Sequence, residues 1–306
     1  MTDMVFYIYN DSESWWIMKR IITLLVIGAI LLLTASCANR EQQPDIIATT
    51  MPVFTFTTAL CSGTPLQVGQ LISENISCLH DYTLTVKHMK MLENTALVVM
   101  SGGGLEEFLE DAIPGDIPVI DASENVHLHH MEETHSHEHH HDSDPHFWLS
   151  IKSAEQMTAT IYQRLKDIYP MYSDQFNQNN DYLQNEFDKL HAYAKDNLSA
   201  LSQRQIITFH DGFSYMAEEF GLTILKSIEE ESGNEASAKD LIEICRLVNE
   251  NALPAIFIEK NGSSSAASVI AQETGAQVFS LDMAISGEDY FSAMYYNINI
   301  LKEALG

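Results

Sequence analysis

The sequence predicts an α/β protein with two lobes of mostly parallel sheet, flanked by helices and joined by a long, rigid helical connector. Short apolar runs alternate with helical patterns in two separate stretches, as in βαβ units. Between these stretches lie two long helical patterns that no glycine interrupts. The chain has 306 residues, 45% of them hydrophobic and 19% charged. It is therefore long and apolar enough to bury such cores.

Each predicted strand is a short apolar run that ends at a turn signal or a polar side chain. The runs of the first lobe lie at 45–53, 65–72, 96–100 and 117–120. Those of the second lobe lie at 205–209, 222–228, 255–258 and 277–281. In open α/β sheets, ligands bind beyond the carboxyl ends of the strands. The residues that follow these runs are therefore the first candidates for a site, and the metal site is expected in the cleft between the lobes.

Apolar residues at helical spacing, with signals at their ends, predict the helices. These lie at 54–60, 86–95, 105–111, 151–169, 173–201, 214–220, 236–251, 263–274 and 290–305. Pro170 separates the two long helices of the connector. Trp148, just before the connector, is expected to pack at the lobe interface. The resulting parts are a leader and signal peptide (1–36), a tether (37–44), an N-terminal lobe (45–150), a connector (151–204) and a C-terminal lobe (205–306).

The first 36 residues have the pattern of an export signal. Lys19 and Arg20 precede a short apolar run at 21–33, and small residues follow up to Cys37. The run is too short for a comfortable transmembrane span. Cys37 after small residues resembles a lipobox, in which the cysteine receives lipid. We therefore expect an extracytoplasmic protein anchored by lipid at Cys37, on a Gram-positive surface rather than in a periplasm; a plain signal peptide or anchor is the alternative.

Three cysteines follow Cys37, and an exported protein lies where disulfides persist. Cys61 and Cys78 are a candidate disulfide that would pin the loop carrying His80. The count is odd, so at least one thiol is left over, and spacing alone does not decide the pairing.

Eight of the 13 histidines lie in one short segment, HLHHMEETHSHEHHH, and no packing need produces that density. We expect this segment, 127–141, to be a flexible loop that binds metal weakly, because neutral imidazole is a good ligand for zinc, copper and nickel. Its histidines are His127, His129, His130, His135, His137, His139, His140 and His141. The net charge of −27 also suits a cation and argues against nucleic acid, whose phosphates it repels. His88 and His191, in helical stretches, are expected at the surface.

A tighter site is predicted outside this loop. His80 lies after the second strand, and His210 and Asp282 end later strands. His146 lies where the loop passes into the long helix. Three imidazoles and a carboxylate are the nitrogen and oxygen ligands expected for four-coordinate zinc, with water as the alternative fourth ligand. Glu259 ends a further strand, and we expect it to accept the second N–H of a ligand imidazole.

Six segments carry recognisable motifs. They are HDYTLT at 80–85, LVVMSGGGLEEFLED at 97–111, DPHFWLS at 144–150, ITFHDGFSYMAEEFGL at 207–222, NEASAKDL at 234–241 and ETGAQVFSLDMA at 273–284. Together they resemble the zinc and manganese solute-binding proteins of ABC importers, over nearly the whole mature chain. The chain departs from the family at Thr83 and Leu84, where Glu-Pro is usual, and at Ala236, where Pro is usual.

The resemblance implies a zinc-binding lipoprotein that captures extracytoplasmic Zn²⁺ and delivers it to the permease of an ABC importer. It implies His80, His146, His210 and Asp282 as the ligands. Manganese favours oxygen, so three imidazoles favour zinc, with Mn²⁺ as the second metal. A manganese-type protein or a metal-dependent adhesin on the same fold is the alternative. A zinc hydrolase is less consistent, because no HExxH-type base stands beside a ligand. We expect a monomeric binding protein and not an enzyme.

Overall fold

The computed structural model describes residues 43–74, 79, 82–109, 111–129, 143–229, 237–260, 262–287 and 289–306, with Arg20, Ile22 and Thr23. The chain divides into two compact units, 1–42 and 43–306, and the second contains both sheets. Nearly all of the export signal, the lipobox with Cys37 and most of the tether lie outside the described residues. Among the helices that are described, none is long and apolar enough to cross a membrane.

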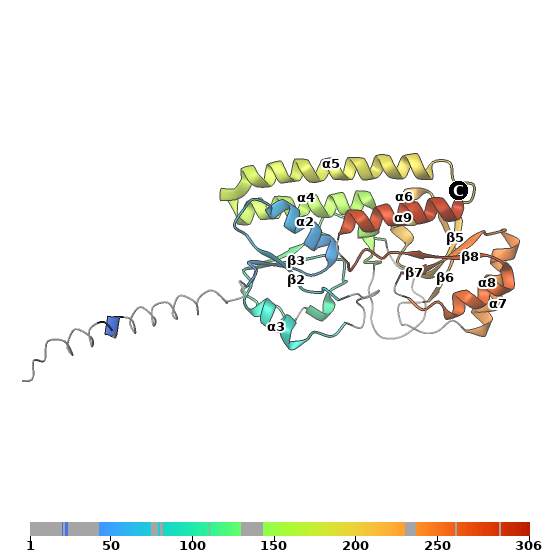
Figure 1. The fold of residues 1–306 in the computed structure, drawn as a ribbon, viewed down its shortest axis with the longest axis horizontal. Helices are drawn as coiled ribbons and strands as arrows, with labels where there is room; N and C mark the ends of the chain where they lie inside the picture. The colour runs from blue at the N-terminus through green and yellow to red at the C-terminus, as the bar shows by residue number, and fades with distance from the viewer. Residues whose placement is uncertain are drawn as a thin grey trace, which may run out of the picture. The chain divides into compact units, whose positions relative to one another are not determined.

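Two parallel four-stranded sheets form the two lobes, which confirms the predicted fold class (Figure 1). The first sheet contains β1 (Ile46–Ala48), β2 (Val68–Gln70), β3 (Leu97–Met100) and β4 (Val119–Asp121), in the order β2-β1-β3-β4. The second contains β5 (Gln205–His210), β6 (Thr223–Glu229), β7 (Ala255–Glu259) and β8 (Gln277–Leu281), in the order β6-β5-β7-β8. Both sheets therefore reverse their winding between their two central strands, which is where α/β folds bind ligands.

The central strands are mostly apolar because helices cover both faces of a parallel sheet. Ile46 and Ile47 of β1 are fully buried, as are Ile206 and Ile207 of β5. In register, Ile46 pairs with residues of both β2 and β3. Continuous apolar runs of this kind are what made the strands predictable.

Eight of the nine predicted helical segments contain an α-helix of the described structure. These helices are α2 (Met51–Cys61), α3 (Val86–Glu93), α4 (Ile151–Ile168), α5 (Ser173–Leu198), α6 (Ser214–Phe220), α7 (Ala238–Glu250), α8 (Ser265–Thr274) and α9 (Tyr290–Leu305). Single 3₁₀ turns are η2 (Glu107–Leu109), η3 (Phe147–Leu149) and η4 (Pro170–Tyr172). Helix α5 packs on α2, α4 and α9 and runs along both lobes (Figure 1). The predicted connector is thus a pair of long helices, α4 and α5.

Two local predictions of secondary structure are wrong. Helix α2 begins at Met51 and not at residue 54, because Pro52 lies in its first turn, where proline suits the backbone and no N–H is needed. The first strand therefore ends at Ala48. The acidic stretch 105–111 forms only the 3₁₀ turn η2, since the side chain of Glu106 bonds back to the main chain before it.

Two side chains are buried where we expected otherwise. His88 is 1% exposed, and its Nδ1 accepts the N–H of Thr85, so it caps α3 instead of lying at the surface. Cys61 is a free thiol, 3% exposed in the apolar core, and burial raises its pKa to about 12. The expected disulfide between Cys61 and Cys78 is therefore not supported, because the Cys61 thiol packs into the core. Cys78 itself lies outside the described residues.

Trp148 connects the start of the connector to the chain beyond β8. Its indole Nε1 donates to the carbonyl of Met283 over 2.8 Å, and its own carbonyl accepts the hydroxyl of Tyr290 over 2.8 Å. Both aromatic side chains are fully buried. The N–H of Met51 also donates to the carbonyl of Ile285 over 3.1 Å. Buried hydrogen bonds therefore fasten the carboxyl ends of the two sheets to each other, and Trp148 packs at the lobe interface as predicted.

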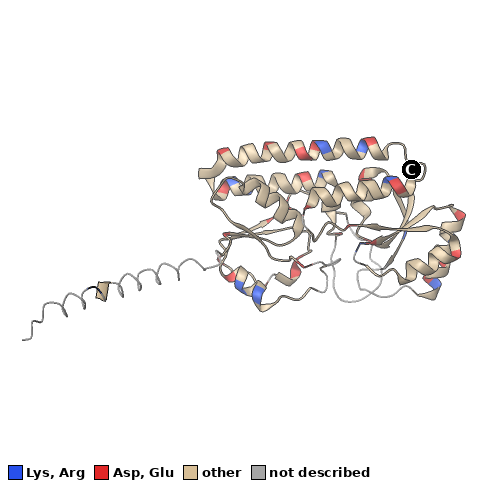
Figure 2. Cartoon of the chain, in the orientation of Figure 1, with Lys and Arg blue, Asp and Glu red and all other residues tan. Residues whose placement is uncertain are grey.

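Charged residues are spread along the helices (Figure 2). Opposite charges pair between β6 and α7, where Lys226 contacts Glu243, and along α7, where Arg246 contacts Glu250. These exposed pairs contribute little to stability.

Glu106 is a buried carboxyl group at the carboxyl end of the first sheet. It accepts hydrogen bonds from the hydroxyl of Thr49 (2.6 Å) and from the N–H groups of Ser101 (2.8 Å) and Gly102 (2.9 Å). Burial raises the pKa of Glu106 to about 7, against the effect of these hydrogen bonds, and the carboxylate of Asp121 raises it further. In the first sheet, an internal hydrogen-bond network thus occupies the point between β1 and β3 where the winding reverses.

Because the pKa of Glu106 is raised from 4.5 to about 7, the folded state binds more protons than the unfolded state between these values. The stabilising contribution is complete below the unfolded pKa and is lost as the pH rises through the folded one. We expect Glu106→Gln to remove this dependence. Because only the wild type loses stability as the pH rises, the free energy of unfolding of the variant minus that of wild type should increase by roughly 1–3 kcal/mol between about pH 4 and about pH 8. Urea unfolding at both pH values measures it. The exposed neighbour serves as control in Glu107→Gln, and a Glu106→Gln protein with the wild-type pH slope would contradict the prediction.

Candidate metal centre

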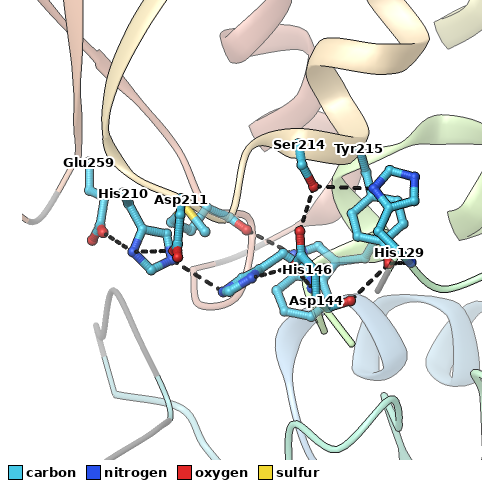
Figure 3. Close-up of polar contacts among 10 residues, drawn as sticks. His129, Asp144, His146, His210, Asp211, Ser214, Tyr215 and Glu259 are labelled. Atoms are coloured by element: carbon cyan, nitrogen blue, oxygen red, sulfur yellow. Dashed lines mark hydrogen bonds and ion pairs between the residues drawn. The ribbon is translucent and has the colours of Figure 1, made fainter. Parts of the chain in front are cut away.

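Two predicted ligands, His146 and His210, meet in the structure (Figure 3). Their Nε2 atoms lie 3.2 Å apart, and their ring planes are 86° apart. Both residues are buried, with 2% and 4% of their surface exposed. Two imidazole nitrogens bound to one tetrahedral zinc ion at about 2.0–2.1 Å lie about 3.3–3.4 Å from each other. The observed separation is therefore close to the one that a shared zinc ion requires.

The two histidines reach this point from different parts of the fold. His210 is the last residue of β5, beside the winding reversal between β5 and β7. His146 directly precedes η3, which Trp148 holds in place. Between them passes the main chain of Gly212, where an added Cβ would lie 2.7 Å from the ring of His146 and 2.8 Å from that of His210. A residue without a side chain lets the backbone approach both imidazoles closely.

A carboxylate contacts the other nitrogen of each imidazole (Figure 3). Asp144 Oδ1 lies 2.9 Å from His146 Nδ1, and Glu259 Oε1 lies 3.2 Å from His210 Nδ1. Asp211 Oδ1 is 3.8 Å from the same His210 nitrogen. A carboxylate that accepts Nδ1–H selects the tautomer whose Nε2 carries a lone pair. Both Nε2 lone pairs then point at one place, which is the arrangement of two ligands to a cation.

Asp144 is 8% exposed, so the site is largely screened from solvent. Burial opposes ionisation of this carboxyl group, but hydrogen bonds from His146 and Ser214 outweigh it and hold the pKa of Asp144 below its usual value. The carboxylate is therefore ionised when the site meets a metal. Its negative charge favours a cation between the imidazoles.

The structure places Glu259 at the end of β7, where the sequence predicts it. It also reveals a site residue that sequence reasoning missed, which is Asp144 of the DPH motif. Its Oδ1 accepts the main-chain N–H of His146 over 3.0 Å, as in a turn closed by an aspartate side chain. An aspartate followed by proline two positions before a ligand histidine was the signal that could have identified it.

Of the other two predicted ligands, the structure describes Asp282 but not His80. Asp282 follows β8 as expected, but its Oδ2 lies 3.0 Å from Lys260 Nζ, and its Oδ1 accepts the N–H of Ala284 over 2.9 Å. Within the described part of the chain, no three His, Cys, Asp or Glu side chains are arranged to hold a metal. The third and fourth ligands stay predictions.

Of the histidines in the predicted loop, the structure describes His127, which is exposed, and His129. The ring of His129 stacks on Tyr215 with centroids 3.8 Å apart, so this histidine is docked on α6 (Figure 3). The remaining loop histidines lie outside the described residues; they are His130, His135, His137, His139, His140 and His141.

Comparisons with known proteins agree with the observed fold. The zinc-binding lipoprotein AdcA of Streptococcus pneumoniae (strain ATCC BAA-255 / R6) is 27% identical over 94% of this chain and 61% of its own length. The zinc-binding protein TroA of Treponema pallidum (strain Nichols) is 27% identical over 74% of this chain and 78% of its own length. The crystal structure of ZnuA superposes with a TM-score of 0.76 at 25% identity, over 85% of this chain and 99% of that one.

The family model described as "Zinc-uptake complex component A periplasmic" matches residues 46–304, which is nearly all of the two-lobed unit. The prediction of a solute-binding protein, and not an enzyme, is thereby confirmed. The chain belongs to the ZnuA family, the zinc-uptake component A proteins among the metal-binding solute-binding proteins of ABC importers.

Proposed function

We propose that this protein captures Zn²⁺ outside the cytoplasm and delivers it to the permease of an ABC importer. The observation that carries the proposal is the pair of Nε2 atoms of His146 and His210, 3.2 Å apart and each backed by a carboxylate. The names of the relatives AdcA and TroA, both zinc-binding, support the same metal. Imidazole ligands favour zinc over manganese, which prefers oxygen.

His80 is our candidate for the third ligand and Asp282 for the fourth. Of the residues that flank His80 in the chain, the hydroxyl of Tyr82 donates to Glu74 Oε2 over 3.1 Å. That contact ties residues on either side of His80 together. For Asp282 to bind metal, its ion pair with Lys260 has to open.

Delivery is proposed to need little relative movement of the lobes. Helix α5 packs along both, and the bond between Trp148 and Met283 is buried. Release therefore depends on the permease disturbing the site rather than on a wide hinge motion. We further propose that lipid on Cys37 holds the protein at a Gram-positive cell surface.

Removing one ligand should abolish tight binding. We expect His210→Ala to lower the zinc affinity of the mature protein by at least about 100-fold, the upper end of what changes around a metal site cost. Isothermal titration calorimetry with Zn²⁺ and Mn²⁺ measures it. The matched control is His191→Ala, because His191 on α5 also contacts two carboxylates, Glu155 of α4 and Glu219 of α6. A His210→Ala protein that binds zinc as tightly as wild type would refute the proposed site.

Residues 130–142, which include most of the His-rich segment, should be dispensable for the tight site. The N–H of Asp144 donates to the carbonyl of His129 over 2.9 Å. Replacing residues 130–142 by one glycine therefore leaves a four-residue turn, His129-Gly-Ser143-Asp144, that this bond can close. We expect the deletion to remove weak additional zinc equivalents from the calorimetric titration and to leave the tight one within about threefold. Loss of the tight equivalent would place essential ligands inside the segment.

Substitutions of Asp282 and of Lys260 should change the zinc affinity in opposite directions. If metal replaces the ammonium group beside Asp282, Lys260→Gln removes a competitor and raises zinc affinity, whereas Asp282→Asn lowers it by about 10-fold or more. Competition with a zinc chelator of known affinity measures both. Unchanged affinity in Asp282→Asn would assign the fourth position to water.

A further inference from the structure

His129 and Asp144, which lie on either side of residues 130–142, are both hydrogen-bonded to helix α6. The segment 130–142 begins after His129 and ends before Ser143. The hydroxyl of Tyr215 accepts the N–H of His129 over 2.7 Å and donates to the carbonyl of Asp144 over 2.8 Å. The hydrogen bond between His129 and Asp144 joins the same two points directly. One phenol hydroxyl thus bridges the start and the end of the segment.

The side chain of His129 is docked in the same place (Figure 3). Its ring lies parallel to that of Tyr215, with an angle of 8° between the planes. Its Nε2 lies 2.8 Å from Glu218 Oε2, and its Nδ1 lies 3.4 Å from Ser214 Oγ. Both ring nitrogens therefore contact side chains of α6. His129 has a structural attachment that its place among the loop histidines did not indicate.

Asp144 links this attachment to the metal centre. The hydroxyl of Ser214 donates a short hydrogen bond to Asp144 Oδ2, while Asp144 Oδ1 accepts from His146 Nδ1. Each oxygen of one buried carboxylate is thus committed, one to α6 and one to a ligand imidazole. Ser214 and Tyr215 follow His210 closely in the chain. The stretch that carries one ligand therefore also holds the carboxylate that orients the other.

We propose that Ser214 and Tyr215 are positioning residues for metal capture, which hold His129 and Asp144 and, through Asp144, fix the direction of His146 Nε2. The proposal rests on the proposed function, in which His146 and His210 share a zinc ion. Neither positioning residue touches the metal. Without them the Asp144 carboxylate can rotate, and the imidazole loses the tautomer and ring orientation that aim it at His210.

The hydroxyl of Ser214 is tested by a pair of variants. Ser214→Ala removes its hydrogen bond to Asp144, and we expect zinc affinity to fall by about 10-fold. Ser214→Thr keeps a hydroxyl and should restore most of that loss. A second readout is the visible absorption of the Co²⁺-loaded protein, which reports ligand geometry. We expect a shifted spectrum for Ser214→Ala and a spectrum like that of wild type for Ser214→Thr.

The hydroxyl of Tyr215 is tested separately. Tyr215→Phe keeps the stacked ring and removes both hydrogen bonds, so we expect about 10-fold weaker zinc binding. The metal-free variant should also be cut faster within 130–142 by a glutamate-specific protease, which has three target residues there, Glu132, Glu133 and Glu138. The control is Tyr193→Phe, which removes a hydroxyl that donates to Asn299 on the outer helices, and which should change neither result.

The outcomes separate this proposal from the function on which it rests. Wild-type protein that binds no zinc would overturn the proposed function. Wild-type protein that binds zinc, with Ser214→Ala and Tyr215→Phe binding equally tightly, would overturn the positioning role alone. Urea unfolding of the metal-free variants checks the fold. If Ser214→Ala does not fold, Ser214→Cys, which keeps the volume with a weaker donor, gives the same comparison with Ser214→Thr.

Discussion

The close approach of His146 and His210 is the contact on which the rest of the molecule depends. Two imidazoles with their Nε2 atoms 3.2 Å apart and their Nδ1 atoms on carboxylates do not form by local folding. The two residues are 64 positions apart, and the whole connector lies between them. The fold has to bring the end of β5 to the start of α4 and hold it there. Much of the buried structure around them serves that constraint.

The two lobes use one topology for two purposes. Each sheet reverses its winding between its central strands, at β1 and β3 in the first and at β5 and β7 in the second. In the first lobe this point is filled by Glu106, which is bonded to Thr49 and Ser101. In the second it carries His210 and Glu259. The same sheet topology thus holds a closed network of hydrogen bonds in the first lobe and a predicted metal ligand with its carboxylate in the second.

Rigidity around the site comes from aromatic packing as well as from hydrogen bonds. Phe56 of α2 contacts the rings of Phe187 on α5 and Tyr290 on α9, with centroids 5.6 and 5.0 Å apart. Tyr290 in turn bonds to the carbonyl of Trp148. Helices from both lobes and from the connector therefore share one apolar core. Such a core restricts the movement of the lobes, so the orientation of the ligand side chains is set before metal binds. Metal binding then has to order few side chains, and its entropic cost is low.

The sequence by itself determined most of the strands and helices, the family and the strand-end or loop-end positions of His146, His210 and Glu259, because apolar periodicity and strand ends are local patterns. Tertiary structure alone decided which groups meet. His129 is docked on Tyr215, which lies 86 positions away; Asp144 is held by Ser214, 70 positions away. His88 was expected at the surface for the same reason, since a histidine in a helical stretch carries no sign of what will cover it. Contacts of that kind depend on how the lobes pack, and no local pattern encodes them.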